Sequence, residues 1–260
     1  DPSRFPPEPA TFLLEIGIEE LPATELDSAS QQLREKVPSM LNSARLSFDD
    51  VRVLGTPRRL MVQVRGLAAA QADEERVIKG PPVDFAFDKQ GQPTKAALVF
   101  AKAQGVDVAD LQTREYEGKS YLVAVKTERG RSTAEVLAEA LPRLIASLKW
   151  AKGMRWNSSN VALARPLRWL VALLGDQVVP FVYAGVQSGR ITYGLRPAGS
   201  PQIELPHADA YLDIMQAHSI LVDAEERQRR IVSQSAELAA SVDGYVPNDP
   251  ELVQEVADLV

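Results

Sequence analysis

The sequence has no cysteine among its 260 residues, which excludes disulfide bonds, thiolate metal ligands and cysteine nucleophiles. It holds two histidines, and no stretch approaches the ~18 apolar residues of a membrane-spanning helix. The first residues lack the pattern of a signal peptide, and the missing initial Met indicates a processed chain or part of a longer one. We therefore expect a cytoplasmic protein without a membrane partner.

Signatures of catalysis are missing as well. No phosphate-binding loop, dinucleotide-binding glycine motif or HExxH pattern occurs. His207 lies close to Asp209, but no nucleophile motif accompanies them that would complete a catalytic triad. Glu19 and Glu20 are adjacent, so on a strand they point to opposite faces and do not form an acid–base pair. We expect no catalytic residue and no metal site in this chain.

The composition is that of an ordinary globular protein, with 45% hydrophobic and 25% charged residues. Strand and helix patterns mix without regular βαβ alternation, which predicts an α+β fold with mixed or antiparallel sheets packed against helices. The expected divisions are a Pro-rich linker or tail at 1–10, an α+β subdomain at 11–130, a basic α+β subdomain at 131–206, and a helical segment at 207–260 that continues into an absent C-terminal part.

Apolar periodicity predicts the individual elements. The expected strands are 11–17, 51–54, 60–64, 167–174 and 178–186, with a hairpin over 112–127. In the third of these strands Met61, Gln63 and Arg65 alternate with apolar residues, which indicates one face in contact with solvent.

Helices are expected at 22–45 and 93–105, and another should begin at a capping box formed by Ser132 and Glu135. Further helices should follow residue 207, one beginning at a second capping box formed by Asp223 and Glu226 and the last capped by Asn248 or Asp249. Pro38 and Pro142 fall inside expected helices and should kink or interrupt them.

Positive charge is concentrated between Leu141 and Ile203. That window holds eight basic residues and one acidic residue, a net charge of +7. Because the whole chain has a net charge of −6, the residues outside the window carry −13. All three tryptophans, Trp150, Trp156 and Trp169, fall in the same window. Lysine and arginine release counterions from phosphates and aromatic rings stack on unpaired bases, so the pattern is typical of an RNA-binding surface.

Other interpretations of these residues stay open. Tryptophans among Leu and Val are usually part of the core, which is our expectation for Trp169. Arginines at strand ends often pair with carboxylates from elsewhere in the fold, and an acidic protein surface would suit the same charge. Outside the window, Arg58 and Arg59 lie in a turn, where they could hold a phosphate or simply be solvated.

Several short segments follow one another in a distinctive order along the chain. They are Leu14–Pro22, Thr56–Leu60, Lys79–Pro81, Lys152–Trp156, Ala164–Leu173, Gly189–Arg196, Asp223–Ile231 and Leu252–Val260. Together they resemble the N-terminal portion of the bacterial glycyl-tRNA synthetase β-subunit, over roughly residues 11–260. Two positions depart from that pattern. Ile18 replaces a small polar residue, and Leu195 replaces the histidine of a Gly-His-Arg string, so no role tied to that histidine carries over.

The resemblance implies an α/β heterotetramer, or a fused α–β chain, that acts as a glycine–tRNA ligase in protein biosynthesis. In such an enzyme the α-subunit binds ATP, Mg and glycine, and the β-subunit binds tRNA(Gly) and is needed for the transfer step. It also implies HD-type and anticodon-binding domains beyond this chain, and a likeness to the body and tail of archaeal CCA-adding enzymes. The implied partners are tRNA(Gly), the α-subunit and a second β-subunit, with no cofactor in this fragment.

We therefore predict that this chain binds the acceptor and elbow region of tRNA(Gly) and supports aminoacylation by the α-subunit without catalysing a step itself. The predicted tRNA-binding residues are Arg58, Arg59, Lys149, Lys152, Arg155, Arg165, Arg168, Arg190 and Arg196. Of these, Arg155, Arg165 and Arg168 are expected to contribute most. The alternative is a protein-interaction module that organises the α/β assembly without touching RNA. An editing hydrolase is a third hypothesis, disfavoured by the missing cysteine and histidine chemistry.

Overall fold

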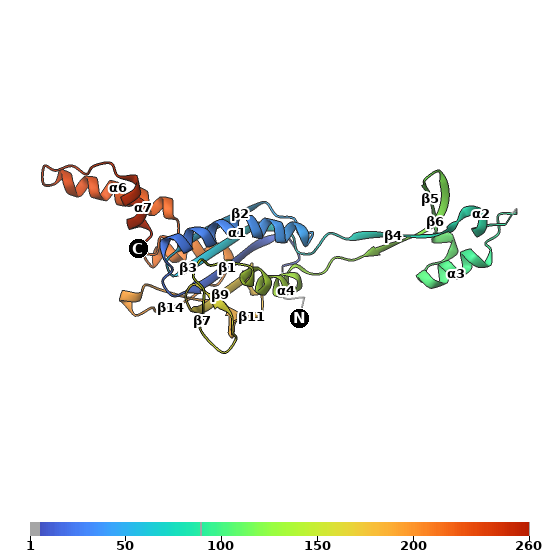
Figure 1. Cartoon of the computed structure of the whole chain (residues 1–260), viewed down its shortest axis with the longest axis horizontal. Helices are drawn as coiled ribbons and strands as arrows, with labels where there is room; N and C mark the ends of the chain where they lie inside the picture. Colours follow the sequence, from blue (N-terminus) through green and yellow to red (C-terminus); the bar gives the residue numbers. More distant parts are fainter. Residues whose placement is uncertain (1–5, 89, 260) are drawn as a thin grey trace. The chain divides into compact units, whose positions relative to one another are not determined.

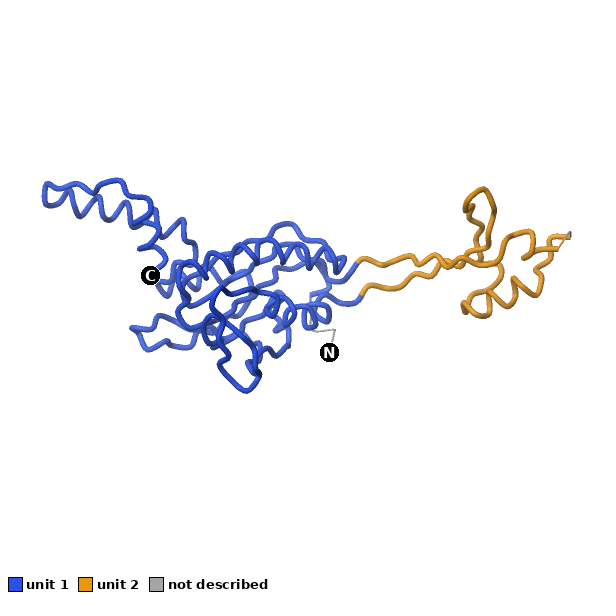
Figure 2. The backbone as a smooth tube through the Cα atoms, viewed as in Figure 1, with its two compact units in different colours: residues 1–71, 131–260 blue, residues 72–130 orange. Residues whose placement is uncertain are grey.

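The computed structural model describes residues 6–88 and 90–259, and the chain forms two compact units (Figure 2). Unit 1 contains residues 1–71 and 131–260, and unit 2 contains residues 72–130. The fold is α+β, as predicted. The expected subdomains at 11–130 and 131–206 divide the chain differently. The reason is that strands from both of them pair in a single sheet.

The central sheet of unit 1 has the strand order β11-β12-β9-β1-β3-β2, with β10 added beside β9 (Figure 1). The strands are β1 Ala10–Ile18, β2 Asp50–Thr56, β3 Arg59–Leu67, β9 Leu167–Leu174, β10 Gln177–Val178, β11 Val182–Tyr183 and β12 Val186–Gly189. The strand β1 lies between β3 and β9 and is antiparallel to both, whereas β12 runs parallel to β9. The strand expected at 178–186 is broken into short pieces around Pro180, which cannot donate a ladder hydrogen bond.

Two helices, α1 (Ala23–Ser43) and α4 (Thr133–Ala146), cover one face of this sheet. Pro38 and Pro142 lie inside them, and both helices continue through, so the predicted interruptions are wrong. An internal proline costs about 3 kcal/mol. Each helix buries several Leu and Val side chains against the sheet, at ~1.5–3 kcal/mol apiece, which offsets that cost.

The other face of the sheet is covered by a second layer. This layer contains β13 (Ile191–Tyr193), β14 (Gln202–Glu204), the 3₁₀ turns η3 (Arg196–Ala198) and η4 (Ala208–Ala210), and α5 (Tyr211–Ala217). Met61 and Gln63 are buried beneath it, so the solvent-exposed face predicted for that strand is wrong, although Arg65 is exposed. The alternation of apolar and polar residues in β3 did not mark a solvent-exposed face, because the layer that covers this face comes from residues more than 120 positions further along the chain.

The predicted helix starts are confirmed. Ser132 and Glu135 form the capping box of α4, and Asp223 and Asp249 accept hydrogen bonds at the N-termini of α6 (Ala224–Ala240) and α7 (Pro250–Ala257). Glu226, the predicted second member of the box at α6, pairs with Arg229 and Arg230. A short ladder of β7 (Met154–Arg155) and β8 (Ala162–Leu163) completes unit 1. None of the helices in the described ranges is long and apolar enough to cross a membrane.

Unit 2 is a three-stranded sheet in the order β4-β6-β5 with helices on one face. Its elements are β4 Glu74–Pro82, α2 Val83–Ala86, α3 Lys95–Gln104, the 3₁₀ turn η2 Val108–Asp110, β5 Gln112–Tyr116 and β6 Lys119–Glu128. The predicted hairpin is confirmed, with Glu117 and Gly118 both at positive φ as a two-residue turn of this kind requires.

Candidate nucleic-acid interface

The end of β1 brings together three of the sequence segments that carry predicted site residues. The amide of Ile18 donates to the carbonyl of Arg58 at 2.9 Å, and the amide of Glu19 donates to the carbonyl of Pro166 at 3.0 Å. The amide of Leu21 donates to the carbonyl of Pro57 at 2.7 Å. The backbone therefore fixes the turn at Glu19 beside the starts of β3 and β9.

Four predicted residues gather around this turn, and we call them the arginine cluster: Arg58, Arg165, Arg168 and Arg196. Arg168 Nε lies 3.2 Å from Glu19 Oε1. Arg196 pairs with both carboxylates, with Nη2 against Glu19 and Nη1 2.9 Å from Glu20 Oε1. The side chains of Arg168 and Arg196 remain 58% and 53% exposed. Both guanidinium groups are therefore held in position yet stay accessible from solvent.

Arg165 and Arg58 are anchored mainly by backbone oxygens. Arg165 Nε donates to the carbonyl of Glu20 at 3.2 Å. Arg58 Nη1 donates to the carbonyl of Gly194 and to Ser200 Oγ, both at 3.2 Å. Burial and the nearby Arg196 lower the pKa of Arg58, but a guanidinium remains charged at neutral pH. The cluster thus holds four cations around two carboxylates and keeps an excess of positive charge.

Arg59 is a correction to the predicted site. Its side chain is 2% exposed, and Nη1 lies 3.7 Å from the fully buried carboxylate of Glu15. It also donates to Thr192 Oγ1 at 3.3 Å and to the carbonyl of Tyr193 at 2.6 Å. A phosphate cannot reach this guanidinium in the folded chain, so Arg59 holds the second layer on the sheet instead.

Glu15 is the centre of a buried polar network that sequence reasoning missed. Its carboxylate accepts hydrogen bonds from the indole of Trp169 and the hydroxyls of Thr192 and Tyr211. Burial, followed by the charge of Glu15, raises the pKa of Tyr211 well above its ordinary value. A glutamate inside an otherwise apolar strand was the available signal, because a buried carboxylate must find partners.

A second group of predicted residues lies along 149–155. Gln32 binds the backbone of Lys149 through two hydrogen bonds of 2.8 Å, and the buried Glu25 accepts from the amide of Lys152 at 3.2 Å. Arg155 Nε donates to the carbonyl of Asn160 across the β7–β8 turn at 3.2 Å. The backbone of this segment is therefore tied down, while the side chains of its three cations are exposed.

Arg190 is separate from both groups. It lies at the opposite end of the sheet, where it donates to the backbone carbonyls of Asp176 at 2.8 Å and Leu205 at 3.4 Å. The register places Asp176 beyond the end of β9 that pairs with the start of β1. A ligand bound at the arginine cluster therefore has a whole strand length between itself and Arg190.

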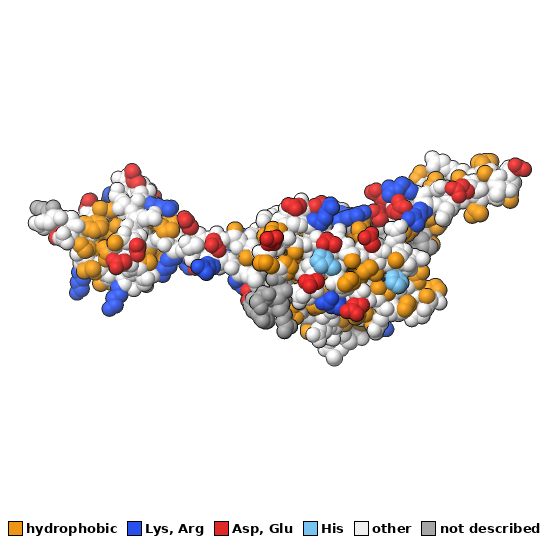
Figure 3. Space-filling model, turned by 180° about the vertical axis from the view of Figure 1, so that it is seen from behind, with side chains coloured by type: hydrophobic (Ala, Val, Ile, Leu, Met, Phe, Trp, Pro, Cys, Tyr) orange, Lys and Arg blue, Asp and Glu red, His pale blue; other side chains and the backbone are white. Residues whose placement is uncertain are grey.

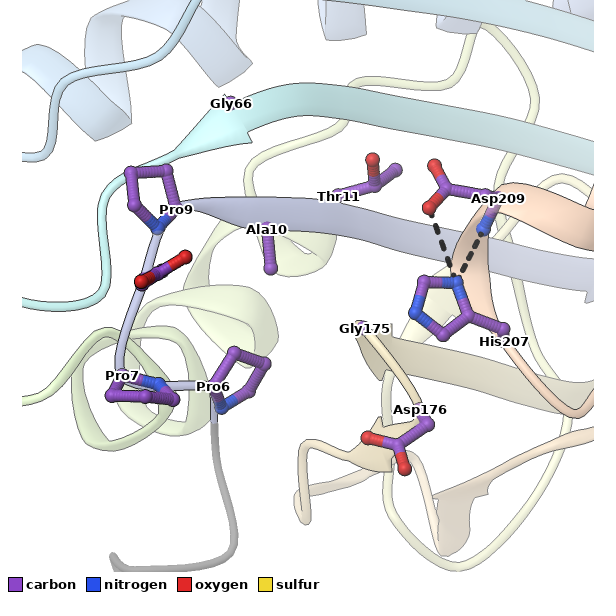
Figure 4. A pocket seen from close by; sticks show the side chains of 11 residues that line it. Pro6, Pro7, Pro9, Ala10, Thr11, Gly66, Gly175, Asp176, His207 and Asp209 are labelled. Atoms are coloured by element: carbon purple, nitrogen blue, oxygen red, sulfur yellow. Dashed lines mark hydrogen bonds and ion pairs between the residues drawn. The ribbon is translucent and has the colours of Figure 1, made fainter.

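An open pocket near Arg190 contains His207 and Asp209 (Figure 4). His207 Nδ1 accepts from the amide of Asp209 at 3.2 Å and lies 3.2 Å from one of its carboxylate oxygens. This is the local geometry of a residue that begins the turn η4. Within residues 6–88 and 90–259, no group of three or more acidic or histidine side chains could hold a metal ion.

The aromatic residues of the basic window divide between core and surface. Trp169 is 5% exposed, as expected for a core residue, and its ring lies 5.0 Å from that of Tyr193. Trp156 is 40% exposed while its indole donates to the carbonyl of Leu163 at 3.1 Å. On the face drawn in Figure 3, cationic and acidic side chains of unit 1 are interleaved, so charge is not separated into one continuous basic patch there.

By class, the arginine cluster is a cationic surface site in which Arg168 and Arg196 are paired with two carboxylates. The comparisons with known proteins add a family to that class. The model of the family described as "Glycyl-tRNA synthetase beta subunit" matches residues 12–260. The chain therefore belongs to the glycyl-tRNA synthetase β-subunit family.

Individual relatives agree with that assignment. The chain is 43% identical over 249 residues to the "Glycine--tRNA ligase beta subunit" of Desulforamulus reducens, covering 96% of this chain and 36% of the relative. For the protein of the same name from Syntrophotalea carbinolica the identity is 42% over 251 residues, with the same coverage. The "Glycine--tRNA ligase, chloroplastic/mitochondrial 2" of Arabidopsis thaliana is 43% identical over 254 residues, covering 97% of this chain and 24% of the relative. The chain thus spans about a third of the length of these bacterial relatives.

Proposed function

We propose that this chain binds tRNA(Gly) at its acceptor and elbow region and so supports aminoacylation by a separate catalytic α-subunit in the cytoplasm. The observation that carries the proposal is the arginine cluster, in which Arg168 and Arg196 are held by ion pairs and remain more than half exposed. A guanidinium group can donate two hydrogen bonds to one phosphate. The family is that of a glycyl-tRNA synthetase subunit, so tRNA is the phosphate-bearing ligand that we expect at this site. ATP and Mg belong to the α-subunit in this proposal.

The site in the proposal differs from the predicted list by one residue. Arg59 is withdrawn because it is buried. Exposed or half-exposed cations make up the rest, namely the arginine cluster, the group Lys149, Lys152 and Arg155, and the separate Arg190. The arginine cluster and Arg155 are expected to contribute most of the affinity, because their guanidinium groups are positioned by the contacts described above and lose little freedom on binding.

Salt-dependent binding tests the proposal. The chain is titrated with a tRNA(Gly) transcript and with an unrelated tRNA at two salt concentrations, and the double variant Arg168→Gln/Arg196→Gln is compared with wild type. Each phosphate contact contributes about 0.9 to the slope of log affinity against log salt on a B-form duplex, so the double variant should reduce the slope by roughly 1.8 if each arginine holds one phosphate. The matched control is Arg229→Gln, because Arg229 is an exposed arginine paired with Glu226 on α6, outside the cluster.

A variant of opposite effect sharpens the test. Glu19→Gln removes the carboxylate that pairs with both Arg168 and Arg196, so it should raise the affinity for tRNA and steepen the salt slope. If the double arginine variant and Glu19→Gln both leave the tRNA affinity unchanged, the arginine cluster is not an RNA contact.

A second candidate function is favoured by the same ion pairs. Because Arg168 and Arg196 already accept carboxylate partners within the chain, they could accept carboxylates of the α-subunit and organise the assembly without touching RNA. Charge reversal by Arg168→Glu would then abolish capture of the α-subunit while the tRNA affinity of the chain stays at the wild-type value.

A further inference from the structure

The sheet of unit 2 has one face that the helices α2 and α3 do not cover. On the covered face Leu122 packs with Ala86 and Ala97 in the small core of the unit. Gly80 lies on the same side, where an added Cβ would meet the ring of Phe100 at 2.5 Å. Successive side chains of a strand point to opposite faces, so the neighbours of these residues project from the uncovered face.

Cations and tyrosines share that uncovered face. The register pairs Lys79 with Val123, Arg114 with Tyr121, and Tyr116 with Lys119, and paired residues of an antiparallel ladder point to the same side. On this face the paired positions of β5 from 112 to 116 and of β6 from 119 to 125 hold no carboxylate. Around the buried Val123, the face therefore presents three exposed cations and two half-buried aromatic rings over adjacent strands.

The two tyrosine rings are in edge-to-face contact, so they offer two ring faces at different orientations. Their centroids are 6.1 Å apart at an angle of 73°, and Lys79 Nζ lies 3.7 Å from the centroid of Tyr121 and 4.8 Å from that of Tyr116. Lys79 is exposed and both tyrosines are half-buried, so a flexible, solvated ammonium lies over the electron-rich ring faces. A flat ligand that displaces the ammonium gains the ring face, and the displaced cation can then bind a charge on that ligand.

We propose that this face of unit 2, formed by Lys79, Arg114, Tyr116, Lys119 and Tyr121, binds single-stranded RNA by stacking unpaired bases on the two tyrosines. An unpaired nucleotide combines a planar base with a phosphate. The base can stack on a tyrosine ring while the phosphate binds a neighbouring cation. A duplex hides its base faces, so it could use only the cations. An acidic protein surface would use the cations and leave the rings without a matching partner.

The inference depends on the proposed function only for the identity of the RNA in the cell. Binding of a short single strand by unit 2 stands or falls without the arginine cluster, which belongs to unit 1. The arginine cluster would bind the phosphates of tRNA, whereas the face of unit 2 would bind the bases of unpaired nucleotides.

The test uses the whole chain and a fluorescein-labelled single-stranded RNA of about ten nucleotides. Tyr121→Leu should weaken binding about fivefold or more, the loss expected when one base is no longer stacked, and Tyr116→Leu should act in the same direction. Tyr121→Phe is the matched control, since it keeps the ring and should bind as wild type does. Lys79→Gln should weaken binding and lower the salt slope by about 0.7, the value for one single-strand phosphate contact.

Two further measurements keep the test decisive. Hydrogen exchange of the wild type with and without the RNA should show added protection in β5 and β6, which does not depend on any variant folding. In the Arg168→Gln/Arg196→Gln background, Tyr121→Leu should still weaken binding of the short single strand by the same factor as in the wild type, which separates this inference from the proposed function.

The inference is overturned if both Tyr→Leu variants bind the single strand as tightly as wild type, or if β5 and β6 gain no protection. It is also overturned if the matched duplex, or poly-L-glutamate, competes as well as unlabelled single strand does, because the face would then be a general polyanion site or a protein contact.

Discussion

Replacing the buried Arg59 by methionine should cost unit 1 about 3–5 kcal/mol of its free energy of unfolding. The guanidinium donates to Thr192 Oγ1 and to the carbonyl of Tyr193, and it is the cation 3.7 Å from the buried Glu15. Methionine replaces most of the apolar stem but leaves that carboxylate without a positive partner in a site closed to water. Removing one member of a buried pair costs more than the pair itself contributes, because the remaining charge stays desolvated.

Urea denaturation followed by tryptophan fluorescence measures this loss in unit 1 alone, because all three tryptophans belong to that unit. The matched control is Arg58→Met, one residue earlier and half-buried, for which a loss of about 1 kcal/mol is expected. Adding Glu15→Gln to Arg59→Met should recover part of the lost stability by removing the unpaired charge. If Arg59→Met destabilises unit 1 no more than Arg58→Met does, Arg59 is not the structural cation described here.

Three other changes have definite expected outcomes. Gly80→Ala should destabilise unit 2 by about 1–3 kcal/mol, because the new methyl group would meet the ring of Phe100; faster hydrogen exchange in β4 and β6 with unchanged tryptophan fluorescence would report it. Ser132→Ala removes the side-chain cap of α4 and should lower the stability of unit 1 by about 1 kcal/mol in urea, whereas Ser132→Asp should retain it. Burial and the charge of Asp258 raise the pKa of Asp27 above its ordinary value of 3.8. The folded state therefore binds this proton more tightly than the unfolded state does, and the free energy of unfolding falls as the pH rises through the pKa of the folded state. Asp27→Asn should therefore be more stable than wild type at pH 7, with a difference in urea midpoint that shrinks as the pH falls toward 4, and a constant difference would contradict this.

Local signals were sufficient for most of the elements. Alternating and continuous apolar runs located β1, β3 and β9, and the capping residues Ser132 and Asp223 marked where helices begin. These signals act within a few residues, so the sequence carries them directly. The helix break predicted at Pro38 was wrong, because the cost of an internal proline was outweighed by burial of the apolar face of α1.

Burial of the polar residues could not be predicted in the same way. Arg58 and Arg59 are adjacent and chemically identical, yet one is half-exposed and the other is sealed in the core. Their difference is set by Thr192 and Tyr211, which lie more than 130 residues further along the chain and close the second layer over Glu15. A short stretch of sequence therefore does not contain both Arg59 and the residues that bury it.

The ion pairs of the arginine cluster raise the question whether those arginines are already fully engaged. An exposed ion pair contributes about 0–1 kcal/mol, so releasing Arg168 or Arg196 from Glu19 costs little when a phosphate arrives. Releasing Arg59 from Glu15 would instead expose a network whose disruption costs several kcal/mol. Solvent exposure, and not the presence of a carboxylate partner, therefore decides which arginines a polyanion can recruit. By that criterion the carboxylates of Glu19 and Glu20 leave the arginines available to an RNA backbone, and the gain in affinity expected for Glu19→Gln is small because the variant removes only this weak competition.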